Sequence, residues 1–125
     1  MDKFSQFKRQ QYLNLETFRR NGESMKTPVW FTQEGETLYV STVANSGKVK
    51  RIRNNGRINV AACKMDGKLT GGWTPAQACE ITDPEIVTKV NRLFDKKYGL
   101  IKKLFDKQRT SKGVKDAVLE VRLID

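Results

Sequence analysis

The segment from Ser46 to Asn55 constrains the fold of this chain more than any other, because it joins a β-branched run to a short stretch rich in cations. The preceding residues, 38–43, read Leu-Tyr-Val-Ser-Thr-Val, a composition typical of a strand. Four cations then follow Ser46 and Gly47. A helix N-terminus presents unpaired N–H groups and the positive end of the helix dipole. The sequence therefore predicts a strand leading into a helix whose first turn holds an anion, with a phosphorylated ligand as the expected occupant.

The first residues of this predicted helix suit a phosphate group. Gly47 lets a ligand approach the backbone closely. Ser46 offers a hydroxyl that can cap the helix or bond a phosphate oxygen, and Lys48 adds a point charge. Gly56 fits the left-handed position that commonly ends a helix.

Length, charge and the absence of histidine narrow the function classes. A chain of 125 residues is expected to form one domain spanning 1–125. The net charge of +10 favours anionic partners, although an excess of surface lysine on a soluble protein gives the same charge. With no histidine in the sequence, Ser-His-Asp and Cys-His catalysis and histidine-rich metal sites are excluded.

The two cysteines and the hydropathy pattern predict the compartment. Cys63 and Cys79 are too few for a closed zinc site, and since each lies in an apolar run we expect two reduced, buried thiols. No apolar run approaches the roughly 18 residues of a membrane span, and no secretion signal is apparent at the N-terminus. A cytoplasmic protein with no membrane partner is expected.

The remaining pattern predicts mostly strands. Asn21-Gly22 is a strong hairpin signal, and Asp83-Pro84-Glu85 is a good helix start. Strands are expected at 12–20, 25–32, 38–43, 57–64, 68–81 (bent) and 117–124, and helices at 3–11, 46–55, 83–98 and 100–107. Many antiparallel strands with few helices indicate a small β-barrel.

Pro28 interrupts the second predicted strand. Proline cannot donate to a strand ladder, so it belongs at an edge or a bulge. A break in pairing there leaves backbone groups free for a flat, hydrogen-bonding ligand, and an ordinary edge strand is the alternative interpretation.

Taken in order, these segments resemble the pyridoxamine-phosphate-oxidase-like split β-barrel family of flavin and deazaflavin proteins. The similarity runs from Tyr12 to Cys63 and is closest to the branch that uses the deazaflavin coenzyme F-420. It rests on segments 17–22, 27–31, 38–40, 46–55 and 57–63. The resemblance implies a mainly β fold: a six-stranded antiparallel split β-barrel of the FMN-binding type with a few flanking helices. It also implies a homodimer with two cofactor sites at the subunit interface.

The resemblance further implies which residues bind the cofactor. Residues expected at its phosphate are Lys48 foremost, Ser46, Gly47 and Arg51 beside it, and Lys50 as a weaker candidate. Residues expected at the isoalloxazine and ribityl groups are Thr27, Pro28 and Val29 through backbone groups, then Ser41, Thr42 and Val43. Trp73 is expected to cover the ring from the partner subunit, with a place in the dimer core as the alternative. Ser46 stands where some relatives carry another cation, and segment 71–75 does not map onto the family.

The implied activity is hydride transfer between the bound coenzyme and a small organic acceptor. F-420 is favoured and FMN is next, because a basic stripe of Lys48, Lys50, Arg51 and Arg53, with Arg19 and Arg20 on a neighbouring strand, suits the polyglutamate tail of F-420. Such chemistry needs no histidine, and water or Tyr39 would supply a proton.

Two other classes of protein remain open from the sequence. The first is a non-catalytic carrier or sensor of such a cofactor. The second, less favoured, is a basic nucleic-acid-binding module in which aromatic residues stack on bases. Those aromatic residues would be Phe18, Trp30, Phe31 and Tyr39.

Overall fold

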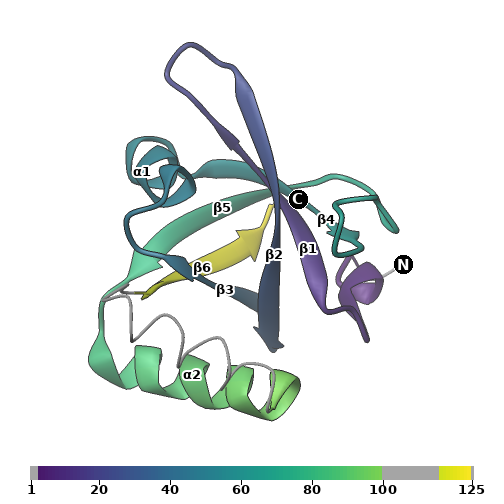
Figure 1. Ribbon diagram of the computed structural model, residues 1–125, viewed down its shortest axis with the longest axis vertical. Coiled ribbons are helices and arrows are strands. Elements are labelled where there is room, and N and C mark those ends of the chain that lie inside the picture. Colours follow the sequence, from purple (N-terminus) through teal and green to yellow (C-terminus); the bar gives the residue numbers. More distant parts are fainter. Residues whose placement is uncertain (1–2, 100–115, 125) are drawn as a thin grey trace.

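The computed structural model describes residues 3–99 and 116–124, and β-strands are the main regular structure in this part of the chain (Figure 1). The strands are β1 (Tyr12–Phe18), β2 (Ser24–Glu34), β3 (Thr37–Val43), β4 (Arg57–Cys63), β5 (Thr74–Ile81) and β6 (Asp116–Leu123). The helices are the 3-10 helix η1 (Ser5–Phe7), α1 (Gly47–Asn54) and α2 (Pro84–Tyr98). The strands form one closed antiparallel barrel in the order β1-β2-β3-β6-β5-β4, as predicted.

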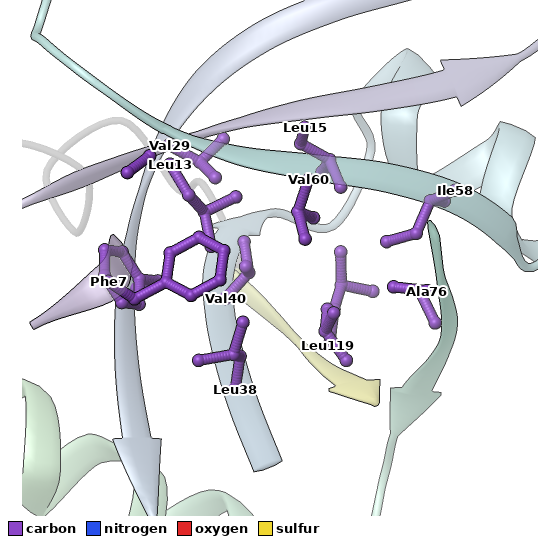
Figure 2. Close-up of a cluster of buried hydrophobic side chains, with 14 of the residues drawn as sticks. Phe7, Leu13, Leu15, Val29, Leu38, Val40, Ile58, Val60, Ala76 and Leu119 are labelled. Atoms are coloured by element: carbon purple, nitrogen blue, oxygen red, sulfur yellow. The ribbon is translucent and has the colours of Figure 1, made fainter. Parts of the chain in front are cut away.

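Side chains alternate between inward and outward positions along the strands, and the inward apolar side chains fill the barrel interior (Figure 2). On β1, for example, Leu13 and Leu15 point inward, and Phe7 of η1 joins the same cluster. Ile52 of α1 also reaches this core. Burial of such apolar surface supplies most of the driving force for folding.

Helix α2 packs against the outside of the barrel through a second cluster. Its buried side chains are Val90, Phe94 and Tyr98, which recur at helical spacing and contact Tyr39 and Val118. The helix begins as predicted, with the carboxylate of its N-cap, Asp83, accepting a hydrogen bond from the Glu85 N–H at 2.9 Å. No helix in the described part of the chain is long and apolar enough to cross a membrane.

Strands β2 and β3 pair over only part of their length, and this opens the barrel wall. They are paired from Phe31–Val40 to Glu34–Thr37, whereas residues 24–30 of β2 pair with β1 alone. Residues 41–43 of β3 pair only with β6. The two strands therefore diverge and leave an open edge on each, which we call the split. Pro28 lies on the open edge of β2 and stays in register with Asn14 of β1, so the predicted edge position is confirmed.

Several expected element boundaries are wrong. The helix expected over 3–11 is the single turn η1, and β1 ends at Phe18, which places Arg19 and Arg20 in the loop rather than on a strand. The bent strand over 68–81 is a loop followed by β5. The expected helix 100–107 lies outside the described residues.

Two residue-level expectations are also wrong. Gly56 is not left-handed; it is needed because a Cβ there would lie 2.5 Å from the Ala78 carbonyl oxygen. Cys79 is exposed whereas Cys63 is buried, because inward-pointing Ala76 and Ala78 on β5 set an alternation that turns residue 79 outward.

Candidate functional site

Helix α1 begins directly after β3, beside the split. Ser46 is its N-cap in an extended conformation, and the Ser46 N–H donates to the Val43 carbonyl at 3.1 Å. The Ser46 side chain makes no capping hydrogen bond, so of the two roles predicted for its hydroxyl only phosphate binding stays a prediction. Its Oγ is instead buried, with no hydrogen-bond partner among the described residues. A buried polar atom without a partner is costly, and a bound ligand is one way to satisfy it.

Arg51 reaches back over the start of α1. Its Nε donates to Thr17 Oγ1 at 2.7 Å, and a Cβ added to Gly47 would lie 2.7 Å from its Nη1. Glycine at position 47 therefore leaves room for the guanidinium. Partial burial and the charge of Arg19 both lower the Arg51 pKa. A cation placed at the positive end of a helix beside a second cation is unfavourable unless an anion binds there.

The hairpin loop between β1 and β2 supplies further positive charge next to α1. Arg19 lies close enough to affect Arg51, and Arg20 Nη2 lies 3.5 Å from Asn54 Oδ1. In Figure 1 this hairpin extends beyond the barrel on the side of α1. The predicted proximity of Arg19 and Arg20 to the helix is thus confirmed, although both lie in the loop.

Not every cation of α1 contributes to this surface. Arg53 points to β5, where its guanidinium donates to the Glu80 carboxylate at 2.8 and 3.1 Å, and this pairing raises the Arg53 pKa. Its expected place in the basic stripe is therefore wrong. Lys48 is half-buried in the first turn, and Lys50 is exposed.

The residues expected at the ring line the split. Thr27, Pro28 and Val29 lie on the open edge of β2, and Ser41, Thr42 and Val43 lie on the open edge of β3. The side chains of Val29 and Thr42 are buried, so these two residues can offer a ligand mainly backbone groups. The fold thus places two strand edges with unpaired backbone beside the start of α1.

Trp73 lies in the loop between β4 and β5, next to β2 of the same chain. Its ring centre is 5.9 Å from Lys26 Nζ, and Lys26 immediately precedes the open-edge segment 27–29. A contribution of Trp73 to the site of a partner subunit stays a prediction.

The aromatic residues proposed for other roles are occupied elsewhere. Tyr39 is buried under α2, with Lys89 Nζ 5.7 Å from its ring, and its role as an alternative to water as the proton source stays a prediction. Phe31 is in the core and Trp30 stacks on Tyr98 with ring centres 4.3 Å apart. These positions remove most of the stacking platform that nucleic-acid binding would need.

Two further residues shape the site and were missed from the sequence. Thr17 is fully buried and anchors Arg51, and Lys26 adjoins Trp73. Thr17 stands at an inward position of β1 otherwise occupied by leucines, and a polar residue in that register was the available signal. Within residues 3–99 and 116–124, no group of three His, Cys, Asp or Glu side chains could hold a metal ion.

A closed barrel that splits along one strand pair, with a basic helix starting at the split, defines the class of split β-barrel proteins. The chain belongs to the pyridoxamine 5'-phosphate oxidase family, whose model matches residues 1–124. No curated protein matches the sequence.

Solved structures share this fold at low sequence identity. HutZ, a heme storage protein from Vibrio cholerae, is 12% identical with a TM-score of 0.73, covering 94% of this chain and 84% of that one. An FAD-binding protein from Mesorhizobium loti is 13% identical with a TM-score of 0.66, covering 97% and 84%. A structure described as an F420 reductase is 17% identical with a TM-score of 0.58, covering 100% and 95%. At such identities the similarity establishes the fold.

Proposed function

We propose that this protein binds a phosphorylated flavin-type coenzyme, with F-420 favoured and FMN next, and is an oxidoreductase acting on a small organic acceptor. The observation that carries the proposal is the guanidinium of Arg51 over Gly47, which follows Ser46, whose buried hydroxyl has no hydrogen-bond partner among the described residues. Both features are unfavourable in the free protein and become favourable once a phosphate binds.

The residues present fit such a coenzyme. Ser46, Gly47, Lys48 and Arg51 would hold the phosphate, with Lys50 at the exposed rim. Arg51 replaces the additional cation that some relatives carry at position 46. The open strand edges would bind the ring and the ribityl chain through backbone N–H and C=O groups, since pairing between β2 and β3 ends at Phe31. Bound coenzyme would supply the hydride chemistry, and the protein would orient the ring and exclude water.

The choice of F-420 over FMN rests on charge beyond the phosphate site. Arg19 and Arg20 extend the positive surface from α1 onto the hairpin loop. A coenzyme with further carboxylates uses this surface, whereas FMN has a single phosphate. The F420 reductase with the same fold supports this choice as an analogy.

We further propose that the protein is a homodimer, with the two coenzyme sites at the subunit interface and Trp73 covering the ring of the partner's coenzyme. Exposure of Trp73 at 37% supports an additional contact for this side chain.

A titration with FMN and with F-420, followed by ring fluorescence, tests the proposal. Tight binding of either coenzyme supports it, and preference for F-420 supports the finer assignment. If neither coenzyme binds, the α1 site holds another anion and the proposal is wrong.

A carrier without turnover is the second candidate. It is favoured by one observation, namely that Tyr39, suggested beside water as a proton source, is buried under α2. Reoxidation of the reduced, bound coenzyme by quinone or nitroaromatic acceptors separates the two candidates, because a carrier will not accelerate it above the rate of the free coenzyme.

A further inference from the structure

The loop between β4 and β5, residues 64–73, presents all the exposed large hydrophobic side chains of the described residues. Met65 is 72% exposed, Leu69 40% and Trp73 37%. Large apolar side chains gathered in one exposed segment mark a surface that contacts another molecule.

This loop is held firmly against the barrel. Gln6 Nε2 donates to the Gly72 carbonyl at 3.0 Å, and Asn14 Nδ2 donates to the Gly67 carbonyl at 3.1 Å. The Thr70 N–H donates to the Ala62 carbonyl at 2.9 Å. Because these bonds hold the loop at several points, Trp73 is exposed in a fixed position on the surface.

A cation lies over one face of the indole. Lys26 Nζ lies 5.9 Å from the Trp73 ring centre and 3.9 Å from Glu16 Oε2. Glu16 is itself fixed, since its Oε1 accepts a hydrogen bond from Asn59 Nδ2 at 2.8 Å. The salt bridge is long and the Lys26 side chain is 53% exposed, so the ammonium retains donors for a ligand.

We propose that Trp73 and Lys26 together form a binding site for a planar aromatic anion. The exposed indole offers a face on which an aromatic ring stacks, and the ammonium pairs with a carboxylate or phenolate on that ring. Lys26 lies on the open edge of β2, and in the proposed dimer Trp73 reaches the ring of the partner's coenzyme, so such a molecule lies next to that ring.

The site therefore indicates the chemical class of the acceptor: an aromatic molecule carrying negative charge. Its role as the acceptor site rests on the proposed coenzyme function. Binding of an aromatic anion to Trp73 and Lys26 does not rest on that function, and it can be measured without coenzyme.

Calorimetric titration of the full-length, coenzyme-free protein with 2-naphthoate tests the site, with the neutral isostere 2-naphthamide alongside. We expect the naphthoate to bind at least about tenfold more tightly than the amide, since only the naphthoate pairs with Lys26. Lys26→Met should weaken naphthoate binding about tenfold, and Lys26→Arg should stay within about threefold of wild type. Trp73→Ala should abolish binding.

The matched control is Lys68→Met, which removes another exposed lysine from the same loop and should leave naphthoate binding unchanged. Urea unfolding of each variant checks that the fold is intact. Equal affinity for naphthoate and naphthamide, or unchanged binding in Lys26→Met, overturns the proposal.

Two further outcomes separate this proposal from others. If the wild type fails to bind naphthoate while Trp73→Ala converts a dimer into a monomer in light scattering, a second copy covers this surface and the proposal is wrong. If naphthoate binds as expected but neither FMN nor F-420 binds, the aromatic-anion site stands and the proposed coenzyme function fails.

Discussion

The start of α1 and the end of α2 both place a cation against the barrel, but among the described residues their surroundings differ. At the end of α2, Lys97 Nζ donates to the Phe31 carbonyl at 2.7 Å and lies 3.6 Å from the centre of the Phe31 ring. At the start of α1, Arg51 lies beside Arg19, and the nearby Ser46 hydroxyl has no partner among the described residues. The first cation has a carbonyl and an aromatic ring as partners within the fold, and we propose that a ligand completes the second arrangement.

The end of α2 also supplies a hydrogen-bond partner for β2 just beyond the first residue of β1, where the ladder between these two strands ends. β1 begins at Tyr12, opposite Trp30, so Phe31 has no β1 partner. The Phe31 N–H donates to Tyr98 Oη at 3.0 Å instead, and Tyr98 Oη lies 2.7 Å from the Gln11 carbonyl. Burial raises the Tyr98 pKa, which keeps the phenol protonated as a donor. This comparison predicts that variants at α2 change stability and variants at α1 change ligand affinity.

The largest expected effect is on stability, from Tyr98→Ala. Loss of this buried ring and of its backbone hydrogen bonds should lower the free energy of unfolding by about 3–5 kcal/mol, measured by urea denaturation. Tyr98→Phe keeps the ring and should lose about 1–3 kcal/mol. A Tyr98→Phe variant as stable as wild type would show that the phenol does not replace the missing strand partner.

The next effect is on coenzyme binding, from Lys48→Ala. Removal of a charge-assisted bond to phosphate should weaken coenzyme affinity by about 1–3 kcal/mol while leaving the urea midpoint unchanged. Arg92→Ala, at an exposed position on α2, is the matched control and should change neither quantity. Equal coenzyme affinity in Lys48→Ala and wild type would contradict the site.

Thr17→Val tests the same difference between ligand affinity and stability, and its expected effect on affinity is smaller. It removes the hydroxyl that holds Arg51 and preserves the shape of the side chain, so coenzyme affinity should fall by about 1 kcal/mol. Stability should change little, because the exchange leaves an inward position of β1 apolar. Fluorescence titration and urea unfolding on the same sample distinguish the two effects. A large loss of stability with unchanged affinity would assign Thr17 and Arg51 to the fold.

The last expected effect is a pH dependence from Lys97, spread over several pH units. Burial lowers its pKa from the ordinary value of 10.5 to about 8. Between these values the unfolded chain binds more protons than the folded one, so stability should rise as pH increases from about 8 towards 10. Above this range the raised pKa of Tyr98 acts in the opposite direction, because the phenol ionises only in the unfolded chain.

Lys97→Met provides the control for this pH dependence. The slope of unfolding free energy against pH between about 8 and 10 should become smaller in this variant. An unchanged slope would assign the effect to other groups.

Local signals predicted most of the fold because they depend on neighbours in sequence. The turn at Asn21-Gly22, the cap at Asp83 and the alternation on β1 are each decided within a few residues. The boundaries that were wrong depend on pairing: β1 ends at Phe18 because its ladder with β2 ends at Ser24. The sequence before Thr74 likewise does not reveal that a single β-bridge, from Cys63 to Leu69, is the only strand-like pairing of this segment.

By itself, the sequence determined a small basic β-barrel with a cation-rich helix start, since strand alternation, helix caps and clustered cations are local properties. Only the tertiary structure decided which cations belong to the site. Arg51 and Arg53 are two residues apart, yet one lies over Gly47 and the other pairs with Glu80 on β5. It also brought Lys26 beside Trp73, across 47 residues of sequence. Such contacts arise from strand order and register, which no single segment contains.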